Sequence, residues 1–332
     1  MPNRTSFQLI SDCRSELMGY AILGVFICHI IMRIPYDFPL LPDLARLVYT
    51  QGFIFLSGFG LYFSYSKNSN LTHYFKRRVN RLFIPYLLMS FPFLTVIVIV
   101  TGQNFINLLG YLTTISFWFN GNFYGMWYIA VQLMLYIVFP LLMFCMFYQD
   151  KWVILRSMTT ILILFAVILF IKNNDANYFA TVGIWIKRVI MFPLGMLCGY
   201  LCTRTSNVKT YISFIIIPIL ICLYALTKYK YGFYFEYIRA LTGIFTLSVV
   251  FFYTRQHHWS LWINKVLQWL GKCSLELYVL HVLIFKTIDS CIDNASVLHM
   301  ALSILIALLI SVPVHNTIDK VINRIINKSN SK

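Results

Sequence analysis

Residues 14–29 read Arg-Ser-Glu-Leu-Met-Gly-Tyr-Ala-Ile-Leu-Gly-Val-Phe-Ile-Cys-His, an apolar run with a cation at its start and an imidazole at its end. At about 100° per residue, Arg14, Met18 and His29 fall within about 60° of one another on a helix. An ionisable side chain at membrane depth is a functional candidate by default, although a neighbouring helix can also satisfy a buried His. The run therefore predicts a membrane helix with two chemically distinct ends on one face.

The composition excludes a water-soluble globule. Of the 332 residues, 59% are hydrophobic and 11% are charged, and the mean hydropathy is +0.73. Such a chain has too little polar surface to face water on all sides. The net charge of +16 would suggest nucleic acid in a soluble protein, but here the basic residues cluster between apolar runs. Topology explains that pattern, so we expect a lipid bilayer and no nucleic acid as partner.

The chain is expected to fold as an all-α, polytopic transmembrane helix bundle. Segments long enough to cross about 30 Å of hydrocarbon can be placed at 16–34, 43–66, 83–101, 123–148, 152–171, 183–202, 210–228, 234–254, 269–287 and 296–315. Residues 102–122 are uncharged but polar, which is typical of an interfacial segment. We therefore expect about ten spans in one integral membrane domain over 1–315, followed by a cytoplasmic amphipathic tail over 316–332.

The basic residues predict the orientation. If the N-terminus is cytoplasmic, the inner side receives Arg4, Arg14, Lys67, Lys76, Arg77, Arg78, Arg81, Lys151, Arg156, Arg204, Lys209, Arg255, Lys265, Lys272, Lys320, Arg324, Lys328 and Lys332. The outer side receives only Arg33, Arg46, Lys172, Lys228, Lys230 and Lys286. This bias places both termini in the cytoplasm. Lys187, Arg188 and Arg239 remain inside spans, and an inward Arg188 implies an anion or a carboxylate nearby.

The eight cysteines lie within or at the ends of apolar segments, without a spacing typical of a disulfide scaffold. Cys198 and Cys202 are one helical turn apart, but no His or acidic residue accompanies them in sequence. They are more typical of small packing residues, and we expect no metal and no bound cofactor.

Five further segments carry polar residues in or beside apolar runs. They are Gln51-Gly-Phe-Ile-Phe-Leu-Ser57-Gly58-Phe59-Gly60, Tyr74-Phe-Lys76-Arg77-Arg78-Val-Asn-Arg81-Leu-Phe-Ile-Pro85-Tyr86, Trp127-Tyr128-Ile-Ala-Val-Gln132, Arg188-Val-Ile-Met-Phe192-Pro-Leu-Gly195-Met, and Leu270-Gly271-Lys-Cys-Ser274-Leu-Glu276-Leu-Tyr278-Val-Leu-His281. Taken with residues 14–29 and in this order, they resemble the membrane acyltransferase-3 family over nearly the whole chain.

The resemblance implies an integral membrane O-acyltransferase that moves acetyl or another acyl group onto an extracytoplasmic sugar. It implies acetyl-CoA as the donor, a bacterial cytoplasmic membrane as the location, and a surface or lipid-linked polysaccharide such as O-antigen or capsule as the acceptor. The chain departs from the family pattern twice. Met18 stands where an Arg is usual, with Arg14 one turn earlier, and Gln132 stands where many members have Glu. Gln keeps hydrogen bonding but cannot act as a base.

Acyl transfer to a hydroxyl needs a base for the hydroxyl proton and a donor for the oxyanion. A buried neutral imidazole suits the first task, and His29 is our candidate base. His281 is the second catalytic candidate, and Glu276 on the same helix is the third. A helical wheel places Tyr278 about 60° from His281 and Glu276 about 140° from it, so Tyr278 shares the His281 face better. A packing or hydrogen-bonding role for His281 stays open.

CoA is a polyanion, and guanidinium groups bind phosphate oxygens bidentately. Arg14, Arg77, Arg78, Arg81 and Arg188 are therefore the candidate donor-binding residues, although such clusters also set topology without a ligand. Trp127, Tyr128, Gln132 and Tyr278 are the candidate substrate-binding residues, with anchoring in an interfacial aromatic belt as the alternative for Trp127 and Tyr128.

Two interpretations remain beside these. Ser57 could be read as a nucleophile, but Gly58 and Gly60 beside it favour close helix packing. A membrane transporter or an exporter of a lipid-linked glycan or a small anion is the alternative function, because polytopic proteins with charges near the midplane are often transporters. The absence of an inverted repeat of motifs between the two halves argues against it.

Overall fold

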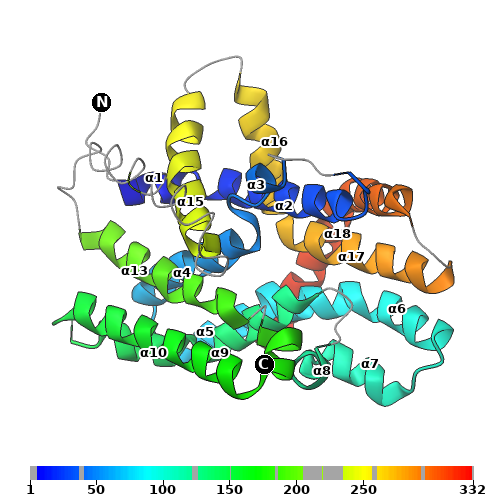
Figure 1. Ribbon diagram of the computed structural model, residues 1–332, viewed down its shortest axis with the longest axis horizontal. Helices are drawn as coiled ribbons and strands as arrows, with labels where there is room; N and C mark the ends of the chain where they lie inside the picture. Colours follow the sequence, from blue (N-terminus) through cyan, green and yellow to red (C-terminus); the bar gives the residue numbers. More distant parts are fainter. Residues whose placement is uncertain are drawn as a thin grey trace.

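The computed structural model describes residues 6–36, 41–121, 126–149, 151–183, 186–204, 219, 235–255, 260–292 and 296–330. The secondary structure of these residues is helical, with turns between the helices and no strand (Figure 1). The predicted all-α class is confirmed. The predicted span 210–228 lies outside the described residues, apart from residue 219.

The longer helices are α2 (Arg14–Ile31), α4 (Tyr49–Lys67), α6 (Ile84–Val100), α9 (Trp127–Phe147), α10 (Val153–Asn174), α13 (Met191–Arg204), α15 (Phe235–Thr254), α16 (Leu261–Lys272), α17 (Ser274–Cys291) and α18 (Val297–Asn330). The short ones are α1 (Ser6–Asp12), α3 (Leu41–Ala45), α5 (Leu71–Arg78), the π-helix η1 (Val79–Phe83), α7 (Phe105–Leu112), α8 (Ile115–Asn120), α11 (Ala176–Tyr178), the π-helix η2 (Phe179–Gly183) and the 3₁₀-helix η3 (Lys187–Ile190).

Seven helical stretches in the described part are long and apolar enough to cross a membrane: Arg14–Ile31, Leu41–Lys67, Leu71–Val100, Trp127–Phe147, Val153–Asn174, Glu236–Thr254 and Val297–Ile325. The pair Ala176–Gly183 and Lys187–Arg204, inclined by 60°, adds an eighth if it forms one broken span. Each of these corresponds to an expected span. The described part of the segment 102–122, which ends at residue 121, contains the two short helices α7 and α8, which are too short to cross.

The expected span 269–287 is corrected by the structure. The helix breaks at Cys273, so that residues 269–272 end α16 and a new helix, α17, begins at Ser274. α17 carries Glu276, Lys286 and Asp289 and is not among the seven apolar stretches. Its residues 276–285 are all buried. A helix covered on every side belongs to the core of a bundle, so protein rather than lipid surrounds α17.

Close backbone approaches set the position of α4 against α13, which lie side by side (Figure 1). A Cβ atom at Gly58 would overlap the carbonyl oxygen of Phe192, and one at Gly195 would overlap that of Phe55. Small residues allow helix backbones to approach in this way in membrane proteins. The packing interpretation of Gly58 is confirmed.

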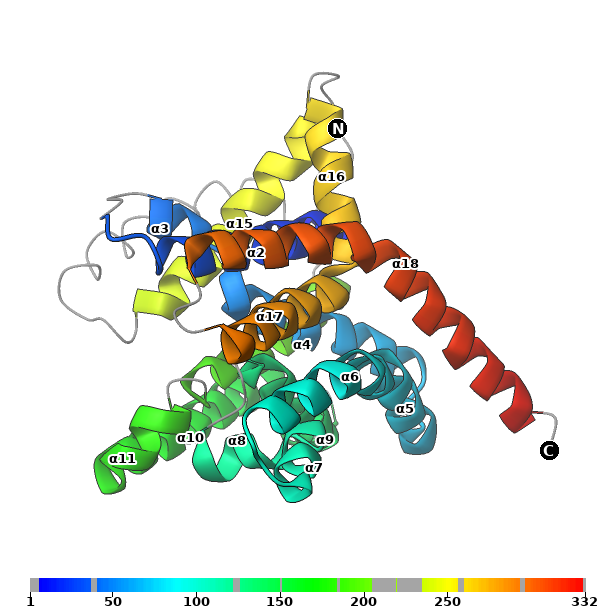
Figure 2. The same ribbon diagram turned by 90° about the vertical axis from the view of Figure 1, so that its right-hand side faces the viewer.

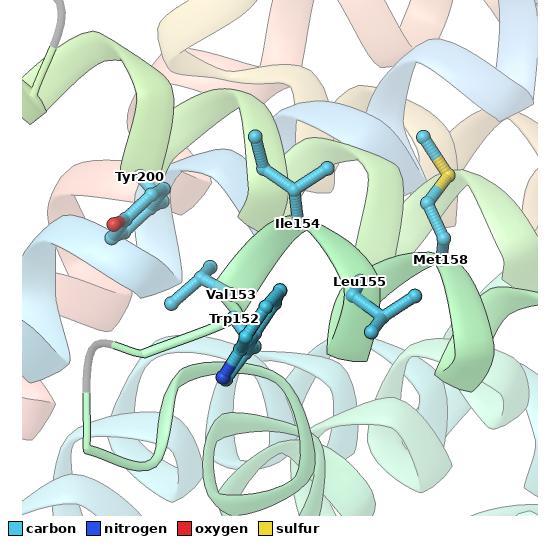
Figure 3. A pocket seen from close by; sticks show the side chains of 6 residues that line it. All are labelled: Trp152, Val153, Ile154, Leu155, Met158 and Tyr200. Atoms are coloured by element: carbon cyan, nitrogen blue, oxygen red, sulfur yellow. The ribbon is translucent and has the colours of Figure 1, made fainter.

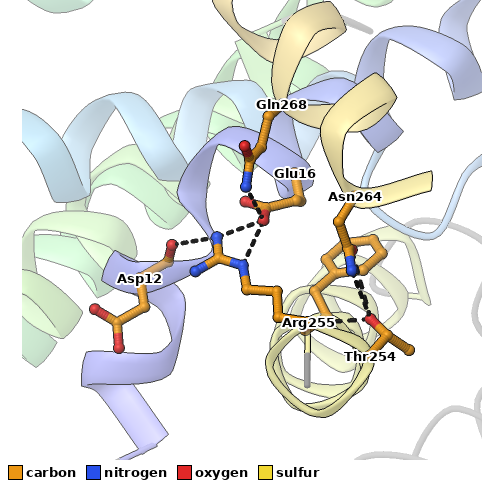
Figure 4. Close-up of polar contacts among 7 residues, drawn as sticks. Asp12, Glu16, Thr254, Arg255, Asn264 and Gln268 are labelled. Carbon is orange, nitrogen blue, oxygen red and sulfur yellow. Dashed lines mark hydrogen bonds and ion pairs between the residues drawn. The ribbon is translucent and has the colours of Figure 1, made fainter. Parts of the chain in front are cut away.

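A buried polar cluster ties the first turn of α2 to two other helices (Figure 4). Glu16, which is fully buried, accepts hydrogen bonds from Arg255 Nε at 2.6 Å and from Gln268 Nε2 at 2.8 Å. Arg255 also donates to the carbonyl oxygen of Asp12 at 2.7 Å. A buried carboxylate is stable only with such partners. Glu16 therefore anchors α2 on the face of the helix that is turned away from Arg14.

α18 passes through the predicted boundary at residue 315 as one continuous helix and extends beyond the other helices toward the C-terminus (Figure 2). Ile318, Asp319 and Ile322, which belong to the segment predicted as a tail, line a cavity of the bundle. The start of the tail therefore contributes to the same unit as the membrane helices. The cytoplasmic placement of both termini stays a prediction.

Candidate active site

A cavity of about 730 Å³ lies between α2, α4, the α5–η1 segment, α9, the junction of α16 and α17, and the middle of α18. Its walls contain the side chains of Arg14, Met18, Ser57, Arg77, Arg78, Arg81, Tyr128, Gln132, Tyr136, Lys272, Glu276, Tyr278, His315 and Asp319, among others. The size is typical of a site for a small molecule or a cofactor. Most of the candidate residues from the sequence therefore meet in one place, although they lie far apart along the chain.

One wall of the cavity is cationic. Arg77, Arg78 and Arg81 come from α5 and η1, and Arg14 joins them from α2, where its Nη2 donates to the carbonyl oxygen of Leu56 at 3.4 Å. The Arg78 guanidinium is buried and lies 5.7 Å from the ring centres of both Tyr74 and Tyr136, whereas Arg77 and Arg81 are exposed. Within the described residues, Arg14 Nε and Arg78 Nε are buried donors without a hydrogen-bond partner.

Another wall of the cavity carries an acid–imidazole–acid chain from α17 and α18. Glu276 Oε1 lies 2.7 Å from His315 Nδ1, and His315 Nε2 lies 3.5 Å from Asp319 Oδ2. His315 and Asp319 were not among the candidate residues predicted from the sequence. Their spacing of one helical turn could have suggested that they share a face, but nothing in the sequence joins them to Glu276.

A pair of aromatic rings also lines the cavity. The centroids of Tyr128 and Tyr278 lie 5.2 Å apart in an edge-to-face arrangement. One turn along α9 from Tyr128, Gln132 Nε2 donates to Ser57 Oγ at 2.7 Å. Ser57 thus lies at the cavity, where it accepts a hydrogen bond from Gln132.

The two candidate histidines form a pair beyond these tyrosines. The ring centroids of His29 and His281 lie 5.4 Å apart, and the Tyr278 ring lies 5.9 Å from that of His281. His281 is fully buried, and its Nδ1 lies 2.7 Å from the carbonyl oxygen of Leu277. Because a carbonyl oxygen only accepts, Nδ1 carries the hydrogen and Nε2 is the free acceptor of the neutral ring. Neither histidine is among the residues lining the cavity, whereas Tyr278 is. Tyr278 therefore connects the cavity to the histidine pair.

Glu276 does not partner His281, since its carboxylate is turned to His315. This agrees with the helical wheel, which placed Tyr278 and not Glu276 on the His281 face. Tyr278 is accordingly the residue of α17 that contacts both the histidine pair and the cavity.

Arg188 and Trp127 lie apart from the cavity. The Arg188 guanidinium is 5.1 Å from the Trp127 ring centre and 3.6 Å from Glu236 Oε2. Lys187 is 3.7 Å from the other oxygen of Glu236, and Gln51 Nε2 donates to Oε2 at 2.8 Å. Glu236 is the carboxylate that an inward-facing Arg188 implied. The structure therefore does not bring Arg188 together with the other four donor-binding candidates.

A second hollow of about 530 Å³ lies at the start of α10 and is lined by Trp152, Val153, Ile154, Leu155, Met158 and Tyr200 (Figure 3). Figure 3 shows these side chains gathered around the first turns of the helix. Its lining holds no charged side chain and no histidine. It lacks the groups that acyl transfer needs.

Comparison with known proteins identifies one family. A family model described as an acyltransferase domain matches residues 19–316, which is most of the chain. No curated protein and no solved structure shows significant similarity. The matched range includes the histidine pair, three of the four arginines of the cationic wall, and the α17–α18 wall up to His315.

Proposed function

The chain belongs to the acyltransferase-3 family, and from this premise we propose that it transfers an acetyl group from cytoplasmic acetyl-CoA to a hydroxyl of an extracytoplasmic or lipid-linked glycan such as O-antigen or capsule. Membership of the family makes it a membrane acyltransferase. The nature of the donor, the acceptor and the bacterial inner membrane as its location are parts of the proposal.

The observation that carries the proposal is the cationic wall. Four guanidinium groups from two separate segments converge on one cavity, and two of them keep buried donor atoms without partners among the described residues. Unpaired buried donors favour a ligand rich in acceptors, and phosphate oxygens accept from guanidinium forks in pairs. The nucleotide end of CoA supplies such oxygens. The α5–η1 segment that holds three of these arginines is on the side expected to be cytoplasmic, where acetyl-CoA is made.

The reaction follows from the order of groups along the site. The thioester of the bound donor would pass the Tyr128–Tyr278 pair to reach His29. His29 would take the proton of the acceptor hydroxyl while its oxygen attacks the thioester carbonyl carbon. The carbon–sulfur bond then breaks, the electron pair leaves on sulfur, and the proton ends on the CoA thiol. An acetyl ester and free CoA are the products.

The donor site can be tested by measuring the affinity of the purified protein for acetyl-CoA. Arg78→Ala and Arg14→Ala should each weaken binding by about 1.5–3 kcal/mol, which is typical of a hydrogen bond to a charged group, or roughly 10- to 150-fold in Kd. Isothermal titration calorimetry in detergent would give these values directly.

The matched control is Lys265→Ala, which removes an exposed base expected on the same membrane side but outside the cavity lining. It should leave Kd unchanged. Equal Kd values for wild type, Arg14→Ala and Arg78→Ala would reduce the arginines to a topology signal and remove the basis for a CoA donor.

A further inference from the structure

Two hydrogen-bond acceptors in the cavity wall are buried and lack donors. Glu276 is only 4% exposed, and its Oε2 atom has no hydrogen-bond partner among the described residues. Gln132 is 1% exposed, and its Oε1 atom also has no hydrogen-bond partner among the described residues. Both residues line the cavity that contains the four arginines.

Such atoms need an explanation, because burying an acceptor without a donor is unfavourable, and more so when the acceptor is charged. The other atoms of the two groups are already engaged. Glu276 Oε1 is held by His315 Nδ1 at 2.7 Å, and Gln132 Nε2 is held by Ser57 Oγ at 2.7 Å. These contacts fix the orientation of both side chains, so that one oxygen of each is left for a donor inside the cavity.

The cavity therefore offers both kinds of hydrogen-bonding group. Arg14 Nε and Arg78 Nε are donors without partners in the described chain, and Glu276 Oε2 and Gln132 Oε1 are acceptors without donors there. A ligand that fits both must carry anionic acceptors at one end and N–H or O–H donors next to them. Four guanidinium groups would repel a simple cation, and the Glu276 carboxylate would repel a simple polyanion.

We propose that Glu276 and Gln132 recognise the pantetheine arm of the acyl donor by accepting hydrogen bonds from its amide N–H groups. This inference rests on the proposed function and assigns the part of the donor between phosphates and thioester. Pantetheine carries two amide N–H groups and one hydroxyl, and a phosphate lies directly beyond its far end. It is thus a chain of donors attached to an anion, as the two walls require.

The placement along the helices agrees with this assignment. Gln132 lies one turn from Tyr128 on α9, and Glu276 lies two residues before Tyr278 on α17. Both acceptors therefore flank the tyrosine pair, beyond which the histidines lie. The arm must run past them when the phosphates bind the arginines and the thioester reaches His29. His315, held between Glu276 and Asp319, acts as a positioning residue for the Glu276 carboxylate.

The experiment compares two donors that share the arm and differ in the nucleotide. Acetyl-CoA has both the arm and the phosphates, whereas S-acetylpantetheine has the arm alone. Kd is measured for both with the purified protein by competition against labelled acetyl-CoA. Glu276→Gln replaces the free oxygen by an N–H group of the same size, and it should weaken both donors by the same factor, about 10- to 100-fold. Arg78→Ala should weaken acetyl-CoA and leave S-acetylpantetheine unchanged.

Gln132 supplies an independent arm of the test. Gln132→Met removes the acceptor at similar volume and should weaken both donors about two- to tenfold, whereas Gln132→Glu keeps an acceptor and should retain binding. If thermal melting shows that Glu276→Gln does not fold, the comparison of Gln132→Met with Gln132→Glu tests the inference alone.

The outcomes separate the inference from its premise. A Glu276→Gln protein that binds both donors normally would overturn the inference, as would one that loses acetyl-CoA but keeps S-acetylpantetheine. A change confined to the KM of the glycan acceptor would also overturn it, because the acceptor would then be the ligand of these groups. Failure of the wild-type protein to bind acetyl-CoA at all would instead defeat the proposed function.

Discussion

Replacing His29 by alanine or glutamine is expected to abolish acetylation of the glycan, with a loss of about 10²–10⁴ in kcat, which is the usual contribution of a general base. His29 lies near the end of α2, on the face that carries Arg14 at its start, and its ring centroid is 5.4 Å from that of His281. Without the imidazole, the acceptor hydroxyl keeps its proton and attacks the thioester slowly. Mass spectrometry of the surface glycan, which gains about 42 Da per acetyl group, reads the result in cells.

The control for this variant is a measurement of its membrane abundance and its Tm. His29 is only partly buried, and its imidazole makes no hydrogen bond within the described residues, so membrane abundance and Tm should stay close to those of wild type. A structural histidine would instead lose stability and activity together. Normal acetylation by a well-expressed His29→Ala protein would remove His29 from the mechanism and move the role of base to His281.

Gly58→Ala should give a large loss of stability through the α4–α13 contact. The new Cβ atom would overlap the carbonyl oxygen of Phe192, which belongs to the backbone of the facing helix and cannot rotate away. Relief requires the two helices to separate, and Gly195 makes the reciprocal approach to Phe55 in the same contact. We expect a cost of about 3 kcal/mol or more, at the upper end for overpacking.

The matched control is Gly199→Ala in the same helix pair. Its Cβ atom would lie 3.1 Å from the carbonyl oxygen of Phe59 and from Tyr62 side-chain atoms, so a shift of a few tenths of an ångström accommodates it. Thermal melting of the detergent-solubilised proteins should place Gly58→Ala well below Gly199→Ala, with Gly199→Ala near wild type. Equal melting temperatures for the two variants would mean that the glycine contact does not hold α4 against α13.

Hydropathy predicted much of the bundle, because the length of an apolar run is a local property. Each of the seven apolar stretches and the bent pair corresponds to an expected span. The break at Cys273 was not foreseen, because the run from 269 to 287 contains no Pro to signal it. Gly271 beside the break packs against the Ser15 carbonyl oxygen of α2, a contact that the sequence does not reveal. Burial of α17 by protein also depends on its neighbours, which hydropathy does not reveal.

The candidate site was predicted in part. Arg14, Arg77, Arg78 and Arg81 were expected together and line one cavity. Arg188 was grouped with them by charge alone, but its partners are Glu236 and Trp127. His315 and Asp319 were missed because their importance comes from Glu276, 39 residues earlier than His315 in the chain. Such a pairing is decided by the packing of α17 on α18, which no local pattern encodes.

The central claim is that the acetyl group of cytoplasmic acetyl-CoA crosses to a glycan through this protein. The direct test supplies inverted membrane vesicles, prepared from cells that make the protein, with acetyl-CoA carrying carbon-13 in its acetyl group, and follows both products. We predict that free CoA thiol appears outside the vesicles and that labelled acetyl ester appears on the glycan inside, with neither product in vesicles containing His29→Ala. Wild-type vesicles in which the label stays on CoA and the glycan remains unlabelled would contradict the account and favour transport.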